Sequence, residues 1–452
     1  MEGATVLPQA LFSRISSAAA DIEKHSVIRV VSHYDADGIA SAGVICNALL
    51  HKRIRFQATL VKSLDEKVIK ALTKDDAECI IMADMGSSYL RELGALDSNV
   101  VVLDHHSLQG DSEKVIYVNP HLWGVDGMTG CSASALCMLL ASKMSETNWH
   151  LLPIAFGGIV GDRQHIRGLS GVNEYLLQEG IERKVVEVQH GSILPSGILK
   201  DMLFSSIDPY IIGVSGNENG TMTLLSEAEV PDGAKLEDLT DSAKRKLASL
   251  LVLTLLKQGC SLSTLEELAR ERYYFPEWKM FASDLASLFN ACGRTDNEGI
   301  GLGCAMSDQR SMEEAAGLRK EYKRSVLSSL QNVEAKGLSK MDHIQYFYSD
   351  NPSLSGMICG LTMQYIGDKD KPTIALSVVG DSARVSSRAT FDILAKGVDL
   401  SVGLREASVA VGGVGGGHAI ASGATVPKGK EEEFLQRLNE LIGTQKMKKP
   451  LT

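Results

Sequence analysis

Short apolar runs that stop at acidic or imidazole residues recur in the first quarter of the chain. Each is rich in β-branched residues, and the three are Val27–Ser32 before His33-Tyr34-Asp35-Ala36-Asp37-Gly38, Cys79–Ala83 before Asp84, and Val100–Leu103 before Asp104-His105-His106. Runs of this kind, bounded by polar residues, are typical of buried parallel strands. Ligands bind at the carboxyl ends of the strands in an open α/β sheet. We therefore expect carboxylates and imidazoles to gather at one edge of one sheet.

Segments with helical spacing separate these runs. Gly38–Lys52 is apolar at helical intervals, shorter helices are predicted at 64–73 and 88–96, and Ile54–Leu60 alternates like a further strand. This order of strands and helices predicts an α/β fold with a doubly wound, mainly parallel sheet. A helix is also expected over 130–143. A fourth buried segment, residues 152–161, is counted with the strands and ends at Asp162.

The rest of the chain has a different pattern, and its 452 residues favour two to four domains. We predict a first domain at 1–190, a mainly helical connector or insertion at 191–340 and a smaller α/β domain at 341–452. Helices are expected in the connector at 241–258, 263–271, 278–292 and 313–334. Strands are expected in the last domain at 344–348, 372–379 and 383–388.

Composition narrows the class of protein. Hydrophobic residues make up 44% of the chain and charged residues 23%, as in ordinary globular proteins. No apolar run approaches the roughly 18 residues that span a bilayer, and Met1–Ala10 lacks the features of a signal peptide. The eight cysteines form no C-x-x-C pair, which argues against structural zinc and suits a reducing compartment. We expect a cytoplasmic protein with no membrane partner; its net charge of −10 leaves room only for a local basic groove.

The first acidic cluster has the residue types of a metal site. Alternation in an extended segment puts His33, Asp35 and Asp37 on the same side of the backbone. Two carboxylates so close together repel each other unless a cation neutralises them. The plainer alternative for this cluster alone is an acidic turn that caps a helix.

The other acidic ends strengthen the metal hypothesis, because they add Asp84, Asp104-His105-His106 and Asp162. Mixed His and Asp ligation suits manganese and, less selectively, magnesium, cobalt or zinc. One carboxylate can bridge two ions, and two ions about 3.5–4 Å apart clamp a phosphoryl group and generate a hydroxide nucleophile. The pattern thus favours a metal-dependent hydrolase.

A glycine-rich stretch near the C-terminus, Gly412–His418, is the remaining candidate for chemistry. Consecutive glycines let backbone N–H groups approach an anion closely, and His418 can donate to a phosphate or a sugar. No Lys-Ser/Thr follows, so the stretch is not a Walker motif. A flexible hairpin without a ligand is the alternative, and the glycines by themselves do not decide between the two.

Taken together, these motifs resemble the four motifs of the DHH phosphoesterases: His33-x-Asp35-x-Asp37-Gly38, Asp84, Asp104-His105-His106, and Asp162 in G-I-V-G-D-R-Q. Gly415–His418, with Ser386-Ser387-Arg388 upstream, looks like the DHH-associated C-terminal domain. NanoRNases and RecJ-type exonucleases share this pairing, whereas family II pyrophosphatases have a different second domain. Asn290–Arg294 resembles the N-A-x-G-R stretch of RecJ-like proteins. Length and the middle segment look most like archaeal RecJ-like proteins, among them the GINS-associated nuclease.

The resemblance implies a role for each candidate residue. The first ion would be held by His33, Asp35 and Asp84, and the second by Asp37, Asp84, His105 and Asp162, both ions being manganese with magnesium or cobalt as alternatives. His106 would contact the scissile phosphate or its leaving oxygen, and Asp104 would support the site. The substrate's phosphates would be bound by Arg388, Ser387, Gly416, Gly417 and His418.

The implied function is a manganese-dependent exonuclease that degrades single-stranded DNA or RNA from an end. A link to GINS or other replisome proteins through the middle segment is part of the same expectation. A nanoRNase or nucleotide phosphatase acting on short oligonucleotides is one alternative, although such chains are typically shorter. The other is a replisome scaffold with secondary nuclease activity, like RecJ relatives that have lost metal ligands. Here every ligand position is filled, which argues against a purely structural role.

Overall fold

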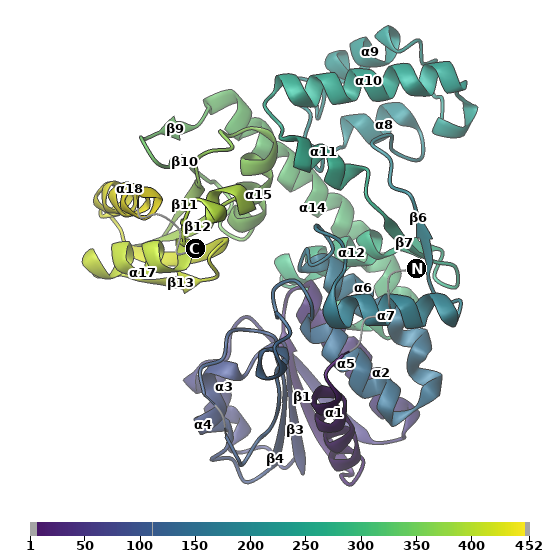
Figure 1. Cartoon of the computed structure of the whole chain (residues 1–452), viewed down its shortest axis with the longest axis vertical. Coiled ribbons are helices and arrows are strands. Elements are labelled where there is room, and N and C mark those ends of the chain that lie inside the picture. The colour runs from purple at the N-terminus through teal and green to yellow at the C-terminus, as the bar shows by residue number, and fades with distance from the viewer. Residues whose placement is uncertain (1–6, 111, 448–452) are drawn as a thin grey trace. The chain divides into compact units, whose positions relative to one another are not determined.

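The computed structural model describes residues 7–110 and 112–447 (Figure 1). Residues 1–6, which belong to the segment considered above for a signal peptide, therefore lie outside the described part. The described residues form two compact units, one made of the residues up to His190 with Glu271–Lys320, the other of Gly191–Arg270 with the residues from Glu321 onward. A compact unit is not the same thing as a domain, and the domain limits at 190 and 340 stay predictions.

The first unit is built on a five-stranded parallel sheet with the strand order β2-β1-β3-β4-β5. Its strands are β1 (Val27–His33), β2 (Arg55–Val61), β3 (Cys79–Ala83), β4 (Asn99–Leu103) and β5 (Ile116–Val118). The predicted doubly wound, parallel arrangement is confirmed. Because every strand runs the same way, the carboxyl ends of β1, β3 and β4 lie at one edge of the sheet.

Helices cover both faces of this sheet (Figure 1). Alternate strand residues such as Ile28 and Ile81 pack on one face with α1 (Gln9–Ile22), α2 (Ala36–His51), α5 (Ala133–Met144), α6 (Leu152–Gly161) and α7 (Gly171–Glu182). The intervening residues, such as Ile80 and Val102, pack on the other face with α3 (Glu66–Leu72) and α4 (Leu90–Leu93). Short 3₁₀ turns connect these elements: η1 (Ser87–Tyr89), η2 (Pro120–Trp123) and η3 (Glu146–Leu151).

One element of this unit differs from the prediction. Residues 152–161 were counted as a strand, but they form the helix α6, with Pro153 in its first turn. The run is almost entirely apolar because α6 is buried between α2, α5 and α12 (Ala282–Arg294). A run buried on all sides has no polar face, so periodicity cannot separate a helix from a strand.

The segment after residue 270 completes the first unit. A small antiparallel sheet joins β6 (Glu187–Gln189), β7 (Arg272–Phe275) and β8 (Met280–Phe281), and α12 and α13 (Glu298–Ala305) pack against α2. The long helix α14 (Gln309–Lys336) follows. Helices are thus present where 278–292 and 313–334 were predicted.

The second unit contains a six-stranded mixed sheet with the order β13-β14-β12-β11-β10-β9. Its strands are β9 (Ser339–Lys340), β10 (Gln345–Tyr348), β11 (Thr373–Val379), β12 (Ser382–Arg388), β13 (Val414–Gly417) and β14 (Ala421–Pro427). One face packs against α17 (Leu400–Ala410) and α18 (Glu431–Met447) in an apolar core, with α16 (Phe391–Ala395) beside it. On the opposite face α15 (Ser355–Tyr365) covers β11 and β12.

The remaining part of the second unit is helical, as expected for the middle of the chain. It comprises α8 (Leu199–Phe204), α9 (Glu218–Glu227), the turn η4 (Leu236–Asp238), α10 (Asp241–Lys257) and α11 (Leu262–Leu268). Across residues 7–110 and 112–447, none of the helices combines the length and the apolar character that crossing a bilayer requires.

Candidate metal centre

The carboxyl ends of three neighbouring strands deliver most of the candidate ligands. His33 is the last residue of β1, Asp35 caps α2 by accepting a hydrogen bond from the Gly38 amide, and Asp37 lies in the first turn of that helix. Asp84 follows β3, and the Asp104-His105-His106 segment follows β4. The parallel sheet therefore brings these side chains to one place.

The ligands form two adjoining groups around Asp84. In the first, the Nδ1 atom of His33 lies 3.0 Å from Oδ2 of Asp35 and 3.5 Å from Oδ2 of Asp84. In the second, the Nε2 atom of His105 lies 3.8 Å from Oδ2 of Asp37 and 3.4 Å from Oδ2 of Asp162. His105 Nε2 is also 3.2 Å from Oδ1 of Asp84, so the two oxygens of that carboxylate face different imidazoles.

Each of these groups has the dimensions of a cation site. One ligand atom from each of His33, Asp35 and Asp84 can be chosen so that all three lie within 4.8 Å of one another, and the same holds for Asp37, His105 and Asp162. Nitrogen and carboxylate donors in this mixture fit a borderline divalent ion such as Mn²⁺. The residues present therefore fit two divalent ions, with Asp84 between them.

Asp162 reaches the second group from a helix. It is the C-cap of α6, where the sequence pattern had suggested the end of a strand. The same helix passes so close to the site that a Cβ at Gly158 would lie 2.5 Å from Oδ1 of Asp37. A glycine at this position lets α6 approach the buried carboxylate and present Asp162.

The backbone of Asp84 has an unusual conformation. Its φ angle is +59°, in the left-handed region that most residues other than glycine avoid, and its amide donates to the Leu103 carbonyl at 2.9 Å. Such a conformation costs free energy and persists only where the surroundings determine it. Here it turns the carboxylate across the strand ends toward both imidazoles.

Asp37 is completely buried and is held by a helix terminus. Its Oδ2 accepts from the Ala133 amide at 2.8 Å and its Oδ1 from the Ser134 amide at 3.1 Å, at the start of α5. The positive end of the helix dipole stabilises a negative charge there. Burial is nevertheless the larger cause, and repulsion from Asp84 the next, of a pKa of Asp37 that is raised to about 6. A cation between these carboxylates would remove that penalty.

His105 is oriented by a chain of hydrogen bonds from residues that the sequence analysis did not single out. Its Nδ1 lies 2.7 Å from the Gly127 carbonyl, which can only accept, so the proton is on Nδ1 and Nε2 faces the carboxylates. Gln164 donates to the same carbonyl at 2.9 Å, and Asn173 donates to Gln164 at 2.7 Å. Gln164 ends the G-I-V-G-D-R-Q segment, which is the signal that could have found it.

His106 and Asp104 form a separate pair beside these groups. The Nδ1 atom of His106 lies 2.7 Å from Oδ1 of Asp104, whose Oδ2 accepts from the Ser87 amide at 2.9 Å. Burial by itself would raise the pKa of Asp104, but the contact with His106 outweighs it and holds that pKa well below its usual value. Burial alone would lower the pKa of His106, and Asp104 instead raises it. His106 is 44% exposed, so its ring can meet a ligand from outside.

Helix α12 supports the loop that carries the first ligands. Gly293 lies directly against the Tyr34 carbonyl, because a Cβ at Gly293 would be 1.9 Å from that oxygen. The next residue, Arg294, donates from Nη1 to the Tyr34 hydroxyl at 2.6 Å. Burial tends to raise the pKa of Asp35, but His33 and then Arg294 lower it well below its usual value. The Asn290–Arg294 stretch thus belongs to the scaffold of the site.

The candidate substrate residues of the C-terminal segment lie in the second unit. Gly416 and Gly417 belong to β13, which forms a hairpin with β14, and the His418 carbonyl accepts from the Ser422 hydroxyl at 2.7 Å within the turn. Arg388 ends β12 and donates to the Ser387 carbonyl at 2.8 Å. Ser387 itself is fully buried, and its hydroxyl donates to the Ser422 carbonyl at 2.9 Å. The hairpin expected of the plainer alternative is present.

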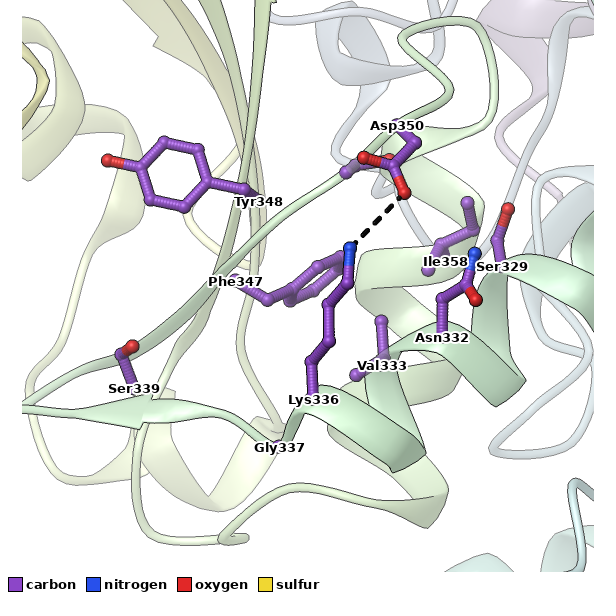
Figure 2. A pocket seen from close by; sticks show the side chains of 11 residues that line it. Ser329, Asn332, Val333, Lys336, Gly337, Ser339, Phe347, Tyr348, Asp350 and Ile358 are labelled. Atoms are coloured by element: carbon purple, nitrogen blue, oxygen red, sulfur yellow. Dashed lines mark ion pairs between the residues drawn. The ribbon is translucent and has the colours of Figure 1, made fainter.

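A cavity of about 190 Å³ lies in the second unit between the end of α14, β10 and α15. Figure 2 shows Lys336 extending over Phe347 toward Asp350, and its Nζ lies 3.5 Å from that carboxylate. Val333, Phe347 and Ile358 form a buried apolar floor. With Asp350 as the single carboxylate in its lining and no imidazole, this cavity does not resemble the metal centre.

Comparison with known proteins identifies the family. The DHH family N-terminal domain matches residues 27–159, and the DHHA1 domain matches residues 344–444. An uncharacterised protein of Methanocaldococcus jannaschii, MJ0831, is 31% identical over 434 residues, which cover 94% of this chain and 95% of that protein. The chain belongs to the DHH family. The resemblance read from the sequence motifs is thereby confirmed.

Several solved structures share the fold of this DHH protein. RecJ from Thermus thermophilus in complex with Mn²⁺ superposes with a TM-score of 0.62 at 14% identity, covering 98% of the DHH chain and 56% of RecJ. An exonuclease RecJ bound to manganese superposes with a TM-score of 0.56 at 14% identity, and the match covers 98% of the DHH chain and 96% of that RecJ chain. CDC45 from Entamoeba histolytica superposes with a TM-score of 0.62 at 10% identity, and the match covers 96% of the DHH chain and 98% of CDC45. The DHH chain thus spans about half the length of the first of these.

Proposed function

We propose that this DHH protein is a manganese-dependent phosphodiesterase that degrades single-stranded DNA or RNA from an end. The observation that carries the proposal is the position of Asp84, whose Oδ1 faces His105 and whose Oδ2 faces His33. A carboxylate placed in this way can bridge two cations. Two bound ions would clamp the phosphoryl group and supply a hydroxide nucleophile at neutral pH.

The proposed ligands of each ion are those that the family resemblance implies. His33, Asp35 and Asp84 would hold one ion, and Asp37, Asp84, His105 and Asp162 the other. The short contacts between these imidazoles and carboxylates support the division, since groups with lone pairs do not converge without a proton or a cation between them. RecJ structures hold Mn²⁺ or Mg²⁺, and manganese is proposed here because the mixed imidazole and carboxylate donors suit it.

His106 is proposed to act on the substrate. Asp104 favours its protonated form, and the exposed part of the ring can donate a proton to the leaving oxygen. Asp104 holds Nδ1, so that Nε2 is directed away from the pair. This arrangement supports a general acid at His106 positioned by Asp104.

The choice of a nucleic-acid strand rests on similarity. A RecJ described as an exonuclease has the same fold over almost all of both chains, which supports an exonuclease. The choice of long single strands over short oligonucleotides is taken from the family resemblance of the sequence motifs. The further proposal of GINS or another replisome protein as a partner of the middle segment is taken from the same family resemblance. The cytoplasmic location expected from the sequence belongs to the same proposal.

A time course with end-labelled substrates tests this function. Single-stranded DNA, single-stranded RNA and dinucleotides of each kind are incubated with the protein and Mn²⁺. A ladder that grows from one end of a long strand is the expected result. Cleavage confined to dinucleotides would instead indicate a nanoRNase-type enzyme, and no cleavage of any substrate would reject the proposal.

A further inference from the structure

One face of the sheet in the second unit combines arginines with small residues in register. Along β12, side chains alternate between the two faces, so Arg384, Ser386 and Arg388 share a face while Ala383, Val385 and Ser387 point the other way. The packing agrees, because Ala383 and Val385 belong to the apolar core with α17 and α18. A Cβ at Gly356 of α15 would lie 3.0 Å from Nη2 of Arg388 and 3.8 Å from the Ser386 hydroxyl.

Strand pairing extends this face across β14 to the edge strand β13. Three rows result: Arg384 beside Thr425 and Val414, Ser386 beside Gly423 and Gly416, and Arg388 beside Ala421. We call these eight residues the arginine face. The sequences of the three strands contain no aspartate or glutamate, so no carboxylate within them offsets the two guanidinium groups.

The outer part of the arginine face is open. Arg384 and Thr425 are exposed, Val414 is 70% exposed, and a Cβ at Gly416 would meet no atom within 4 Å. Within residues 7–110 and 112–447, the side chain of Arg384 forms no hydrogen bond or ion pair. It is therefore a cation that extends the face beyond Arg388 and is available to a ligand.

The two arginines are spaced for more than one phosphate. Four residues of strand separate their Cα atoms by about 13 Å. The Arg388 guanidinium is tied to its own strand by donating to the Ser387 carbonyl, so it does not reach toward Arg384. Gly423 and Gly416 lie in the row between the two arginines. Because glycine has no side chain, the backbone of a ligand can approach the sheet closely there.

We propose that the arginine face is a track for a single strand, with Arg388 and Arg384 binding different phosphates of the same strand. This inference rests on the proposed function and extends it by naming Arg384, with Thr425 and Val414 beside it, as a contact for nucleotides further along. Cationic side chains on strands that contain no carboxylate complement a polyanion, and glycine and serine between them leave room for sugars. The absence of aromatic rings from the face predicts binding through the backbone of the strand, independent of sequence.

Fluorescence anisotropy of labelled strands tests the track without hydrolysis, in EDTA. Arg384→Ala is expected to bind a 12-nucleotide strand about fivefold more weakly than wild type. The slope of log affinity against log salt concentration should become shallower by the amount expected for about one phosphate contact. Binding of a dinucleotide, which is too short to reach Arg384, should change much less. Gly416→Val should also weaken binding of the long strand, because the valine side chain would occupy the space proposed for the strand. The melting temperature of the protein should not change, because that side chain would meet no protein atom.

Arg405→Ala is the matched control, since Arg405 is an exposed arginine of the same unit on α17, which packs against the opposite face. Equal affinities for Arg384→Ala, Arg405→Ala and wild type would overturn the track, as would equal losses for long strands and dinucleotides. Hydrolysis of bis-p-nitrophenyl phosphate by the wild type with Mn²⁺ is measured in parallel. That rate tests the metal centre alone, so failure of the track and failure of the proposed function are distinguished.

Discussion

Nη1 of Arg294 lies 2.6 Å from the hydroxyl oxygen of Tyr34, the residue between the candidate ligands His33 and Asp35. The guanidinium carbon also stands 5.2 Å from the centre of the Tyr34 ring. Arg294 lies 260 positions after Tyr34 in the chain, so α12 holds this loop from a distant segment. The first ligands are held by α12 as well as by their own strand.

Gly293→Ala is expected to disturb this contact, because the new Cβ would meet the Tyr34 carbonyl at 1.9 Å. Overpacking of this kind typically costs about 1–3 kcal/mol, and the melting temperature should fall with it. Hydrolysis with Mn²⁺ should fall as the loop shifts. The control is Gly299→Ala in α13, where a Cβ meets no atom and alanine favours the helix by up to about 1 kcal/mol. Similar stability of both variants would contradict the proposed support by α12.

The two adjacent histidines should behave differently. His105→Ala removes a proposed ligand and should weaken Mn²⁺ binding in calorimetry, whereas His106→Ala should keep the metal and slow turnover. If His106 protonates the leaving oxygen, its loss should matter much less for p-nitrophenolate, which needs no proton, than for a DNA strand. His150→Ala, at an exposed position, serves as control. A loss of metal from His106→Ala alone would mean that the roles are exchanged.

The metal-free protein should become less stable as the pH rises. The pKa of Asp37 is raised from 3.8 to about 6, so its contribution is fully present below pH 3.8 and is lost as the pH rises through about 6. Nearby carboxylates raise the pKa of His33 and of His105 well above 6.5 against the effect of burial, and their contributions are lost at still higher pH. The lowered pKa values of Asp35 and Asp104 affect stability only in more acidic solution.

Differential scanning fluorimetry in EDTA between about pH 5 and about pH 8 measures this effect. The melting temperature should fall across the range, and added Mn²⁺ should raise it more at the upper end than at the lower. Asp37→Asn should flatten the acidic part of the curve. A melting temperature that rises with pH in EDTA would contradict the assigned environment of these groups.

Much of the site could be predicted because it depends on local sequence order. Three apolar runs of about four to six residues were correctly predicted as parallel strands, and parallel strands place His33, Asp84 and Asp104 at the same edge. These features need no knowledge of distant contacts. The expected alternation of His33, Asp35 and Asp37 was wrong at Asp37, because α2 begins at Ala36 and Asp37 lies in its first turn rather than in an extended segment.

The remaining features depend on contacts between distant segments. The helix that ends at Asp162 was not predicted, because residues 152–161 are buried on every side. The run therefore lacks the polar face by which a helix is recognised in a sequence. Gln164 and Arg294 contact Gly127 and Tyr34, which lie 37 and 260 positions away in the chain. The prediction of Ser387 as a phosphate contact beside Arg388 could have been corrected from the sequence, because adjacent residues of a strand point to opposite faces and it is Ser386 that shares the face of Arg388.

Metal content and hydrolysis of an Asp84→Asn variant, measured together, test the central claim most directly. Asparagine tolerates the left-handed backbone at this position and keeps the size of the side chain, so the fold should persist. Wild type should bind two Mn²⁺ per chain in calorimetry, whereas the variant should bind fewer and hydrolyse a single strand at least about a thousandfold more slowly. Two bound ions and a rate above about a tenth of wild type in Asp84→Asn would contradict a bridging carboxylate at Asp84.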